Sequence, residues 1–404
     1  MSIYIIIGKN FGDEGKGLAT DYFAARSQES SSPCIVVRHN GGGQAGHTVD
    51  LPQKRFVFHQ LSSGSFRDAD TYWAQSFLPD LYKLSDELKE FYELHGKVPK
   101  IHAHHLCKCV YIDDVLINMA LETSRGSNRH GSCGMGINEA VERSAKSEYC
   151  LFLGELCKMS AAELYSHLEQ LRKKHVPKRL KELGLSLQDI GEYGELLTDR
   201  NVLINAAEQM HYATRFITIA DTSVLCNYSD VIFEGAQGLL LDENYLPFAP
   251  HLTSSKTGSD NPSSIIKEHF PDTVPELVYV TRSYVTRHGA GPLPYEKLWD
   301  QSLFPVCDPT NIPNEWQGAL RMAPHGTPEE FFSDIFADAK KNDMSHTVSC
   351  MLTHLNESDN KLISCQGFVD VADWFGNPTA QCIEKLYLSG TPYSQDIKIS
   401  DKRT

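Results

Sequence analysis

The sequence predicts an α/β fold in which helices flank a P-loop-like, mostly parallel central sheet. Short β-branched runs, of which residues 3–7 are the first, alternate along the 404-residue chain with segments of helical periodicity. This alternation is typical of parallel sheets with helices on their faces. The first run also leads into a glycine-rich loop and then a helix-forming segment, which is the local order of a phosphate-binding loop. Ligands of such folds bind beyond the carboxyl ends of the strands.

Each expected element follows from its own pattern. Residues 3–7 and 34–38 are short, apolar and β-branched, which predicts buried strands. Residues 17–27 and 79–95 are expected to be helical, and the second segment carries apolar residues at helical spacing with charges between them. The remaining buried strands are expected at residues 56–61, 231–233, 277–281, 348–352 and 362–365.

We expect residues 1–404 to form a single domain, because no internal repeat or low-complexity linker divides the chain. A largely helical subdomain is expected at about 100–230, since residues 160–230 are mostly helix-forming and polar-faced. The polar tail after Ile397 is expected to fray.

Composition argues against several classes of partner. The formal net charge is −14 and the pI is about 5.6, which disfavours a nucleic acid polymer because phosphate backbones require a basic face. No apolar run reaches the length of a membrane span, so no membrane association is expected. The eleven cysteines form no Cys-x-x-Cys pair, which fits a reducing, cytoplasmic location.

The strongest motif is GKNFGDEGKG at residues 8–17, between a predicted strand and a predicted helix. Its glycines let backbone N–H groups close around phosphate oxygens, and Lys16 supplies a positive charge. Because Gly17 stands where a Walker A loop has Ser or Thr, Asp13 is the expected magnesium ligand. The alternative is an ordinary glycine-rich turn with a solvated lysine. The nucleotide-binding residues predicted here are Gly12, Glu14, Gly15, Lys16 and Gly17.

A second glycine-rich loop, at residues 40–48, follows the strand predicted at residues 34–38. Its three consecutive glycines allow the backbone to approach a ligand closely. His47 is a candidate to donate a hydrogen bond to a transferring phosphoryl group. A solvated loop histidine is the alternative.

Together, the two loops resemble those of the adenylosuccinate synthetase family, because GDEGKG at residues 12–17 is followed by AGHT at residues 45–48. Further segments resemble the family in the same order along nearly the whole chain. They are HQLSSG at 59–64, FEGAQG at 233–238, LD at 241–242, TSS at 253–255 and TRHGAGPLP at 286–294. The resemblance implies a ligase of purine nucleotide synthesis.

In that family the γ-phosphoryl group of GTP moves to O6 of IMP, and the amino group of L-aspartate then displaces phosphate at C6. The resemblance implies that Asp13 takes the N1 proton and binds Mg²⁺, with the backbone of Gly46 as a further ligand. His47 would assist transfer to O6, Lys16 would hold the triphosphate, and Gln237 would read or polarise O6. Positioned acid–base groups typically contribute about 10²–10⁴-fold each.

The resemblance also implies a site for the purine monophosphate. Ser132 and Cys133 match the family's Gly-Thr-Thr-Gly segment less closely, and Thr253 and Gln44 are expected to join them. Arg143 stands where the family supplies an arginine across a homodimer interface to the 5′-phosphate. An isolated surface arginine is the alternative. If the match holds, complete sites require a homodimer.

Two segments depart from the family. The first is its guanine-reading Thr-Lys-x-Asp, which is THLN at residues 353–356. An aspartate accepts two hydrogen bonds from guanine, whereas Asn356 offers one acceptor and two donors, so the choice between GTP and ATP stays open. We expect His354 and Asn356 to form the base pocket with Ser389 and Gly390, which lie in a loosely similar C-terminal segment.

The second departure is the family's aspartate-binding Thr-Thr-Gly-Arg loop, which NEWQGALR at residues 314–321 replaces. Arg321 is expected to clamp a carboxylate of the amino acid, with help from Arg287. The replacement is similar to the loop of synthetases that act on (d)GMP to make 2-aminoadenylosuccinate. Asp13 favours an IMP-like substrate, because those relatives often lack this carboxylate.

Two other functions remain open: a non-catalytic nucleotide-binding regulator, and an enzyme that transfers the phosphoryl group without ligation. The intact Asp13, Lys16 and His47 oppose the regulator, whereas the altered loop at 314–321 favours it.

The sequence HAHH at residues 102–105 suggests metal binding. However, no nearby carboxylate or thiolate set has clear coordination spacing, although Cys107 and Cys109 are close. We therefore favour a polar strand or loop over a zinc site.

Overall fold

The structure is a computed structural model that describes residues 1–126, 134–302, 318–341 and 343–401. The predicted substrate-binding residues Ser132 and Cys133 lie outside these ranges, as does the first half of the replacement loop at 314–321. No helix within the described ranges is both long and apolar enough to cross a membrane.

A ten-stranded sheet forms the centre of the molecule, in the order β16-β15-β12-β9-β1-β8-β2-β5-β6-β7. Strands β16 and β15, at one edge of the sheet, are antiparallel. All other neighbours run parallel, which confirms the predicted fold class. The strands are β1 (Ser2–Gly8), β2 (Cys34–Arg38), β5 (Asp70–Trp73), β6 (Ile101–Ala103), β7 (Ile217–Ile219), β8 (Asp230–Gly238), β9 (Glu276–Arg282), β12 (Thr347–Thr353), β15 (Ile383–Leu388) and β16 (Lys398–Asp401).

Strand β1 lies in the middle of the sheet and is apolar on both faces. Ile3, Ile5 and Ile7 face one core, and Ile6 faces the other, as the two-residue period of a strand requires. Helices α9 (Asp260–His269) and α10 (Pro328–Ala339) contribute to the first core, whereas α1 (Lys16–Glu29) contributes to the second.

Two predicted strands exist but lie outside the central sheet. The strand expected at residues 56–61 is β4 (Lys54–Phe58), which pairs in a hairpin with β3 (His47–Leu51). The strand expected at residues 362–365 is β13 (Lys361–Ser364), which pairs with β14 (Gly367–Asp370). Short apolar runs therefore identified strands but not the sheet to which each belongs.

The prediction that the tail after Ile397 frays is wrong for the residues that the structure describes. Lys398–Asp401 forms β16 and pairs with the open edge of β15. Its backbone groups gain ladder partners there, which compensates for the polar sequence.

The remaining two-stranded sheet pairs β10 (Val285–Arg287) with β11 (Arg321–Ala323). Helix α11 (Val371–Gly376) follows β14.

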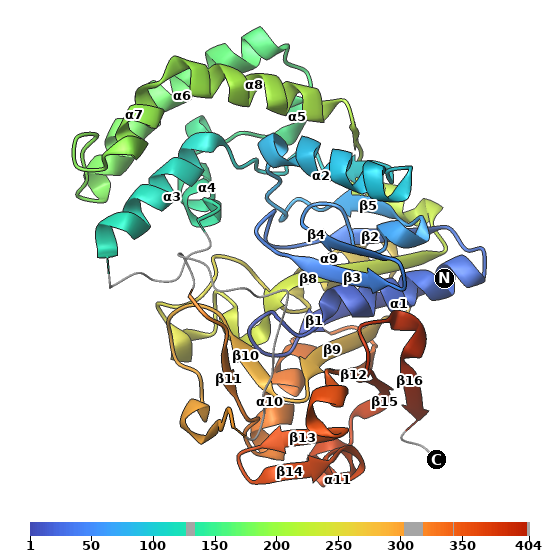
Figure 1. Cartoon of the computed structure of the whole chain (residues 1–404). Helices are drawn as coiled ribbons and strands as arrows, with labels where there is room; N and C mark the ends of the chain where they lie inside the picture. The colour runs from blue at the N-terminus through green and yellow to red at the C-terminus, as the bar shows by residue number, and fades with distance from the viewer. Residues whose placement is uncertain (127–133, 303–317, 342, 402–404) are drawn as a thin grey trace.

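Most of the chain between β6 and β7 is helical. The apolar faces of α2 (Leu81–His95), α6 and α8 contribute to one core cluster beside the outer strands. Figure 1 shows α6, α7 and α8 in an outer layer at the top, on the opposite side of the molecule from β13 and β14. The helices of this segment are α3 (Ile112–Arg125), α4 (Ile137–Ser144), α5 (Leu153–Leu156), α6 (Ala161–Glu182), α7 (Glu192–Thr198) and α8 (Arg200–Thr214).

Buried ion pairs join these helices at the start of α3. Asp113 receives hydrogen bonds from Arg172 of α6 at 2.5–3.2 Å, and Asp114 is paired with Arg143 of α4 at 2.9 Å. Both carboxylates have no exposed side-chain area. A charge buried this deeply depends on its partner, because water cannot replace it.

We expect Arg172→Leu to lower the free energy of unfolding by about 3–5 kcal/mol, since it leaves Asp113 buried without a cation. Urea denaturation followed by circular dichroism measures the change. The control is Arg55→Leu, which removes a half-exposed partner of Asp50 and should cost no more than about 1 kcal/mol. Equal losses in the two variants would contradict this role for the buried pair.

Candidate functional site

Several chain segments meet the glycine-rich loop at the carboxyl end of β1. A Cβ atom on Gly12 would lie 3.0 Å from Cα of Gln237, at the end of β8. A Cβ atom on Gly15 would lie 3.2 Å from Cγ2 of Thr353, at the end of β12. Both glycines also have positive φ angles, 117° and 95°. The loop therefore needs glycine for its own conformation and for the close approach of its neighbours.

The loop holds an anionic group of its own. The Glu14 carboxylate accepts hydrogen bonds from the backbone N–H groups of Asn10 at 3.0 Å and Gly12 at 2.7 Å. Nζ of Lys16 lies 3.3 Å from the same carboxylate and donates to the carbonyl of Gly12 at 2.6 Å. Glu14 and Lys16 are each 2% exposed. Converging N–H groups and a lysine form a cradle for negative charge, in which Glu14 braces the loop.

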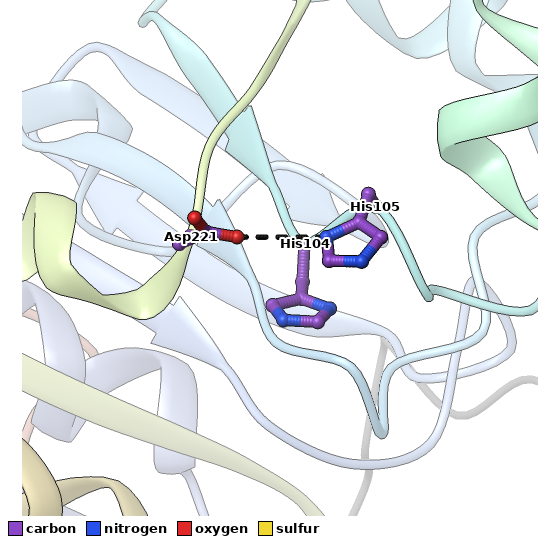
Figure 2. A group of neighbouring side chains, drawn as sticks. All are labelled: His104, His105 and Asp221. Carbon is purple, nitrogen blue, oxygen red and sulfur yellow. Dashed lines mark ion pairs between the residues drawn. The ribbon is translucent and has the colours of Figure 1, made fainter.

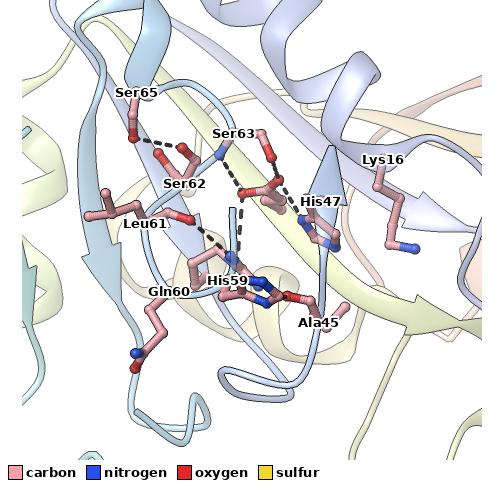
Figure 3. A network of polar contacts seen from close by, with 12 residues as sticks. Lys16, Ala45, His47, His59, Gln60, Leu61, Ser62, Ser63 and Ser65 are labelled. Carbon is pink, nitrogen blue, oxygen red and sulfur yellow. Dashed lines mark hydrogen bonds and ion pairs between the residues drawn. The ribbon is translucent and has the colours of Figure 1, made fainter. Parts of the chain in front are cut away.

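His47 lies beside this loop and is oriented by a buried carboxylate (Figure 3). A Cβ atom on Gly17 would lie 3.2 Å from Cβ of His47, so the histidine packs against the start of α1. Its Nδ1 is 2.7 Å from Oε1 of Glu234, a residue of β8. Ser63 donates to Glu234 from its backbone N–H at 3.2 Å and from its hydroxyl group, and Nε of Arg38 lies 3.8 Å away.

These contacts determine the charge of the pair. Burial lowers the pKa of His47 to about 4, although Glu234 acts in the opposite direction. Burial alone would raise the pKa of Glu234, but His47, Arg38 and the hydrogen bonds outweigh it and lower this pKa to about 2. Near neutral pH the pair is a carboxylate that accepts Nδ1–H from a neutral imidazole. Nε2 of His47 is buried and has no hydrogen-bond partner among the described residues.

The second glycine loop is tied to the end of β8. Asn40 and Ala236 exchange hydrogen bonds of 3.0 and 2.8 Å, and a Cβ atom on Gly41 would lie 2.8 Å from Cβ of Ala236. The next residue, Gln237, has a positive φ angle of 61°. Within the described residues, the side-chain oxygens of Gln237 and Gln44 are buried without a partner. Such groups are costly unless something binds to them.

The proposed magnesium ligand Asp13 lies at the tip of the first loop. Its backbone carbonyl accepts a 2.5 Å hydrogen bond from Nε of Arg282, and its carboxylate is 3.7 Å from Nε2 of His288. A quarter of its side chain is exposed. Gly46 precedes β3, and a Cβ atom there would lie 3.2 Å from Val57. The carboxylate of Asp13 and the carbonyl of Gly46 are oxygen donors of the kind that Mg²⁺ prefers.

The two segments predicted to contact the base of the triphosphate lie together. The backbone N–H of Leu355 donates to the carbonyl of Ser389 at 3.2 Å. A Cβ atom on Gly390 would lie 3.8 Å from the backbone nitrogen of Asn356. Asn356 is exposed, whereas the ring of His354, two residues earlier, lies 2.9 Å from the Thr353 hydroxyl group.

Arg287 and Arg321 are cross-strand partners in the β10–β11 ribbon. Arg287 is 2% exposed, and its guanidinium group donates to the carbonyls of Pro292 and His251 at 2.6 and 3.0 Å. Burial, followed by the charge of Arg321, lowers the pKa of Arg287 to about 10. Arg321 pairs with Glu296 at 2.9 Å. Two adjacent guanidinium groups repel each other, and an anion between them would relieve this repulsion.

The structure does not present Arg143 to a neighbouring subunit. Its side chain has no exposed area, and besides Asp114 it donates to the carbonyl of Cys109 at 2.7 Å. In this structure the guanidinium group links α4 to Asp114 and to the carbonyl of Cys109, and it does not reach the surface. The prediction overlooked Asp114 because its pairing with Arg143 is not evident from the sequence. Thr253 lies on a loop, half-buried, and its N–H donates to the carbonyl of Leu241 at 2.9 Å.

Sequence reasoning also missed functional candidates. Glu234 belongs to the FEGAQG segment but received no role, although a glutamate that directly follows an apolar strand-forming run, in the middle of the mostly buried β8, is itself a signal. Ser63 and His288 were likewise quoted only as motif members. His288 is unexpected beside Asp13, since nothing in the local sequence links the two residues.

The fold and the site define an α/β protein in which an anion cradle at the carboxyl end of the central strand adjoins a histidine–carboxylate pair. The comparison of sequences is more specific. The profile of the adenylosuccinate synthetase family matches residues 5–308, and the chain belongs to this family. This confirms the resemblance of the motifs.

Individual relatives agree with the profile. The adenylosuccinate synthetase of Clostridium botulinum (strain Alaska E43 / Type E3) is 30% identical over 306 residues, covering 74% of this chain and 66% of the relative. That of Chlorobium chlorochromatii (strain CaD3) is 29% identical over 306 residues, covering 73% and 64%. The chain therefore spans slightly less than two thirds of the length of these relatives.

Solved structures support the fold. A fully ligated adenylosuccinate synthetase of Plasmodium falciparum superposes with a TM-score of 0.63 at 18% identity, covering 99% of this chain and 87% of that one. The succinoaminodeoxyadenylate synthetase of cyanophage S-2L, bound to dGMP and to dATP as an energy donor, gives a TM-score of 0.60 at 13% identity and covers 98% and 95%.

The low pKa of His47 predicts a pH-dependent stability. Below about pH 6.5 the unfolded chain binds a proton that the buried imidazole does not take up until about pH 4, so acid favours unfolding. Glutamine cannot be protonated at this position. We therefore expect the free energy of unfolding of His47→Gln to fall by about 2–3 kcal/mol less than that of wild type between pH 7 and pH 4.5. Urea denaturation at both pH values measures this difference, and equal losses would contradict it.

Proposed function

We propose that this protein is a purine nucleotide ligase of the adenylosuccinate synthetase type. A nucleoside triphosphate phosphorylates O6 of IMP or a related 6-oxopurine monophosphate, and L-aspartate then displaces the phosphate to give adenylosuccinate. The observation that supports this most is the proximity of the anion cradle, the His47–Glu234 pair and Gln237 at the ends of neighbouring strands. A bound polyphosphate and a purine oxygen can meet there.

The first loop serves phosphoryl transfer in this proposal. Lys16 and the N–H groups around Gly15 and Gly17 hold the β- and γ-phosphates, while Glu14, which accepts from the N–H of Gly12, keeps the loop in shape. Positioning and charge neutralisation account for most of the catalysis of phosphoryl transfer.

His47 acts next to O6. Nε2 has no hydrogen-bond partner among the described residues. It would take up a proton from water as the negative charge of the bound phosphates favours the cation, and would then donate a hydrogen bond to the phosphoryl group, while Glu234 stabilises the cation through Nδ1. A buried carboxylate supports the histidine of hydrolases in the same way. Gln237 contacts O6, and Asp13 takes the N1 proton, which moves electron density to the oxygen that attacks phosphorus.

Mg²⁺ is the proposed cofactor. Asp13 would hold it through the carboxylate and Gly46 through the backbone carbonyl, and the bound ion would neutralise charge on the phosphates.

For the amino acid, we propose that Arg287 and Arg321 bind the carboxylates of L-aspartate. A carboxylate ligand would compete with Glu296 for Arg321 and would lie close to the buried charge of Arg287. Nε of each arginine is buried without a partner among the described residues. The monophosphate would contact Gln44 and Thr253, together with Ser132 and Cys133.

The proposal leaves the base of the triphosphate as GTP or ATP. The exposed Asn356 lies next to Gly390, with His354 and Ser389 close by, but an asparagine does not favour guanine as an aspartate would. The cyanophage relative of similar fold binds dGMP and dATP, which supports (d)GMP as the alternative substrate. Asp13 favours IMP.

We further propose one functional unit over residues 1–404, with a largely helical subdomain at about 100–230, working as a homodimer in the cytoplasm. The described cysteines are all free, which suits a reducing compartment. The buried Arg143 does not support a dimer in which this side chain reaches a partner's phosphate. In a homodimer, residues other than Arg143 would have to contact the partner's 5′-phosphate.

A substrate matrix tests the function. The protein is mixed with Mg²⁺, L-aspartate, ATP or GTP, and IMP, GMP or dGMP, and the products are identified by mass spectrometry. We expect adenylosuccinate from IMP, with one nucleoside diphosphate released per product. Asp13→Asn should abolish turnover, because an amide cannot accept the N1 proton, and circular dichroism should show that the variant is folded.

The other outcomes separate the alternatives. A succinylated product from GMP or dGMP alone would establish the alternative substrate. Nucleoside diphosphate without a succinylated purine would indicate transfer or hydrolysis only, and binding without turnover would indicate a regulator. Wild-type rates in Asp13→Asn would exclude this residue as the base.

The arginine pair predicts an effect confined to the amino acid. Arg321→Met should raise the KM for L-aspartate by about 10- to 100-fold, which corresponds to the loss of a charged hydrogen bond, and should leave the KM for IMP within about twofold. Arg55→Met is the control, because this half-exposed side chain pairs with Asp50 at the end of the β3–β4 hairpin opposite to His47. Steady-state kinetics with each substrate varied in turn decides, and an equal rise in both KM values would contradict the assignment.

A further inference from the structure

A side-chain cluster outside the catalytic loops combines two histidines and a carboxylate. His104 and His105 follow β6, and Asp221 follows β7 (Figure 2). Each residue offers a ligand atom, and these atoms all lie within 4.8 Å of one another. The sequence had argued against a metal site at residues 102–105 because it showed no nearby carboxylate. The fold supplies that carboxylate from a distant segment.

Sheet geometry explains why the three residues meet. Strands β6 and β7 are parallel neighbours, and the residue after β7 extends their ladder, since the N–H of Ala220 donates to the carbonyl of Ala103 at 3.0 Å. The carboxyl ends of the two strands are therefore in register. The residues that come next, His104 and Asp221, must lie close together.

The backbone on each side is held in place. The carbonyl of His105 accepts a 2.9 Å hydrogen bond from Gly154, where a Cβ atom would lie only 2.7 Å from Cβ of His105. The carbonyl of Asp221 accepts from Val224 at 3.1 Å, in the short 3-10 helix Thr222–Asn227. Both ligand-bearing segments are thus anchored, while their side chains remain accessible.

The three side chains contact one another at the ends of these strands. Oδ1 of Asp221 lies 3.5 Å from Nδ1 of His105, and its carboxylate caps no helix N–H group. The imidazole rings of His104 and His105 are stacked, with centroids 4.5 Å apart and planes 26° apart. Asp221 and His105 are 74% and 49% exposed at the side chain, so small rotations can close the ligand atoms onto one ion.

We propose that His104, His105 and Asp221 form a binding site for a divalent transition-metal ion, with Zn²⁺ as the reference ion. Imidazole nitrogens select transition metals over Mg²⁺, and two imidazoles with one carboxylate leave a fourth tetrahedral position for water. If Nδ1 of His104 is the ligand atom, the ion replaces one neutral hydrogen bond, which this nitrogen accepts from the N–H of Leu106 at 3.2 Å.

The bound ion would join the loops after β6 and β7. Strand β7 is only three residues long and forms the outer edge of the sheet, where it is mostly exposed. A metal bridge would hold this edge strand against its neighbour and stabilise the folded chain by mass action. The site does not depend on the proposed ligase function.

Zinc titration tests the site. Chelator-treated full-length protein is titrated with ZnCl₂ by calorimetry, in excess Mg²⁺ to occupy sites that prefer oxygen ligands. We expect one equivalent to bind, and each of His104→Ala, His105→Ala and Asp221→Asn to weaken this binding by at least about tenfold, since changes around metal ligands commonly cost 10- to 100-fold. His167→Ala, on α6, is the matched control and should bind as wild type does.

Cobalt spectra identify the ligands. Four-coordinate Co²⁺ should give visible bands without a thiolate charge-transfer band, and the bands should disappear in the variant that lacks all three side chains. Cys226, which is exposed on the neighbouring 3-10 helix, is the competing ligand. Equal zinc affinity in wild type and the triple variant would overturn the proposal, as would binding that is lost in Cys226→Ser.

Discussion

The close approach of chain segments around the first glycine loop is the constraint on which the site depends. A side chain at Gly8 would collide with the end of β8 and with Glu14, and one at Gly12 or Gly15 would press tightly on the end of β8 or β12. Strands β1 and β8 can therefore lie side by side with their ligand-binding ends uncovered by bulky groups. The same compactness turns the N–H groups of Asn10 and Gly12 toward one point, where the Glu14 carboxylate accepts both.

Charge compensation recurs at different depths around this loop. Glu14 pairs with Lys16 inside the loop. Glu234 of β8 lies beside both His47 and Arg38. Farther out, the buried guanidinium group of Arg287 donates to two carbonyl groups and lies over the rings of Phe11 and Phe248. The site therefore passes from internally balanced charge at the loop to excess positive charge at the β10–β11 ribbon. This gradient suits a ligand that carries carboxylates at one end.

The sequence predicted what local pattern determines. Strands β1 and β2, helix α1 and both glycine loops follow from apolar runs and from glycine's conformational freedom. What it could not predict were contacts between distant segments. The pairing of His47 with Glu234, the burial of Arg143 against Asp114, and the meeting of His105 with Asp221 have no local signature. The pairing of β16 was also missed, because it depends on the open edge of β15 rather than on hydrophobicity.

The pairing of β16 affects how separate molecules meet. A parallel sheet that stops at a long apolar strand exposes N–H and C=O groups to which any other strand can add. Here the border of β15 is covered by a four-residue strand that begins with Lys398. A short, charged border offers little to an incoming chain, so this segment guards against edge-to-edge aggregation. The polar character that suggested disorder thus suits a protective role.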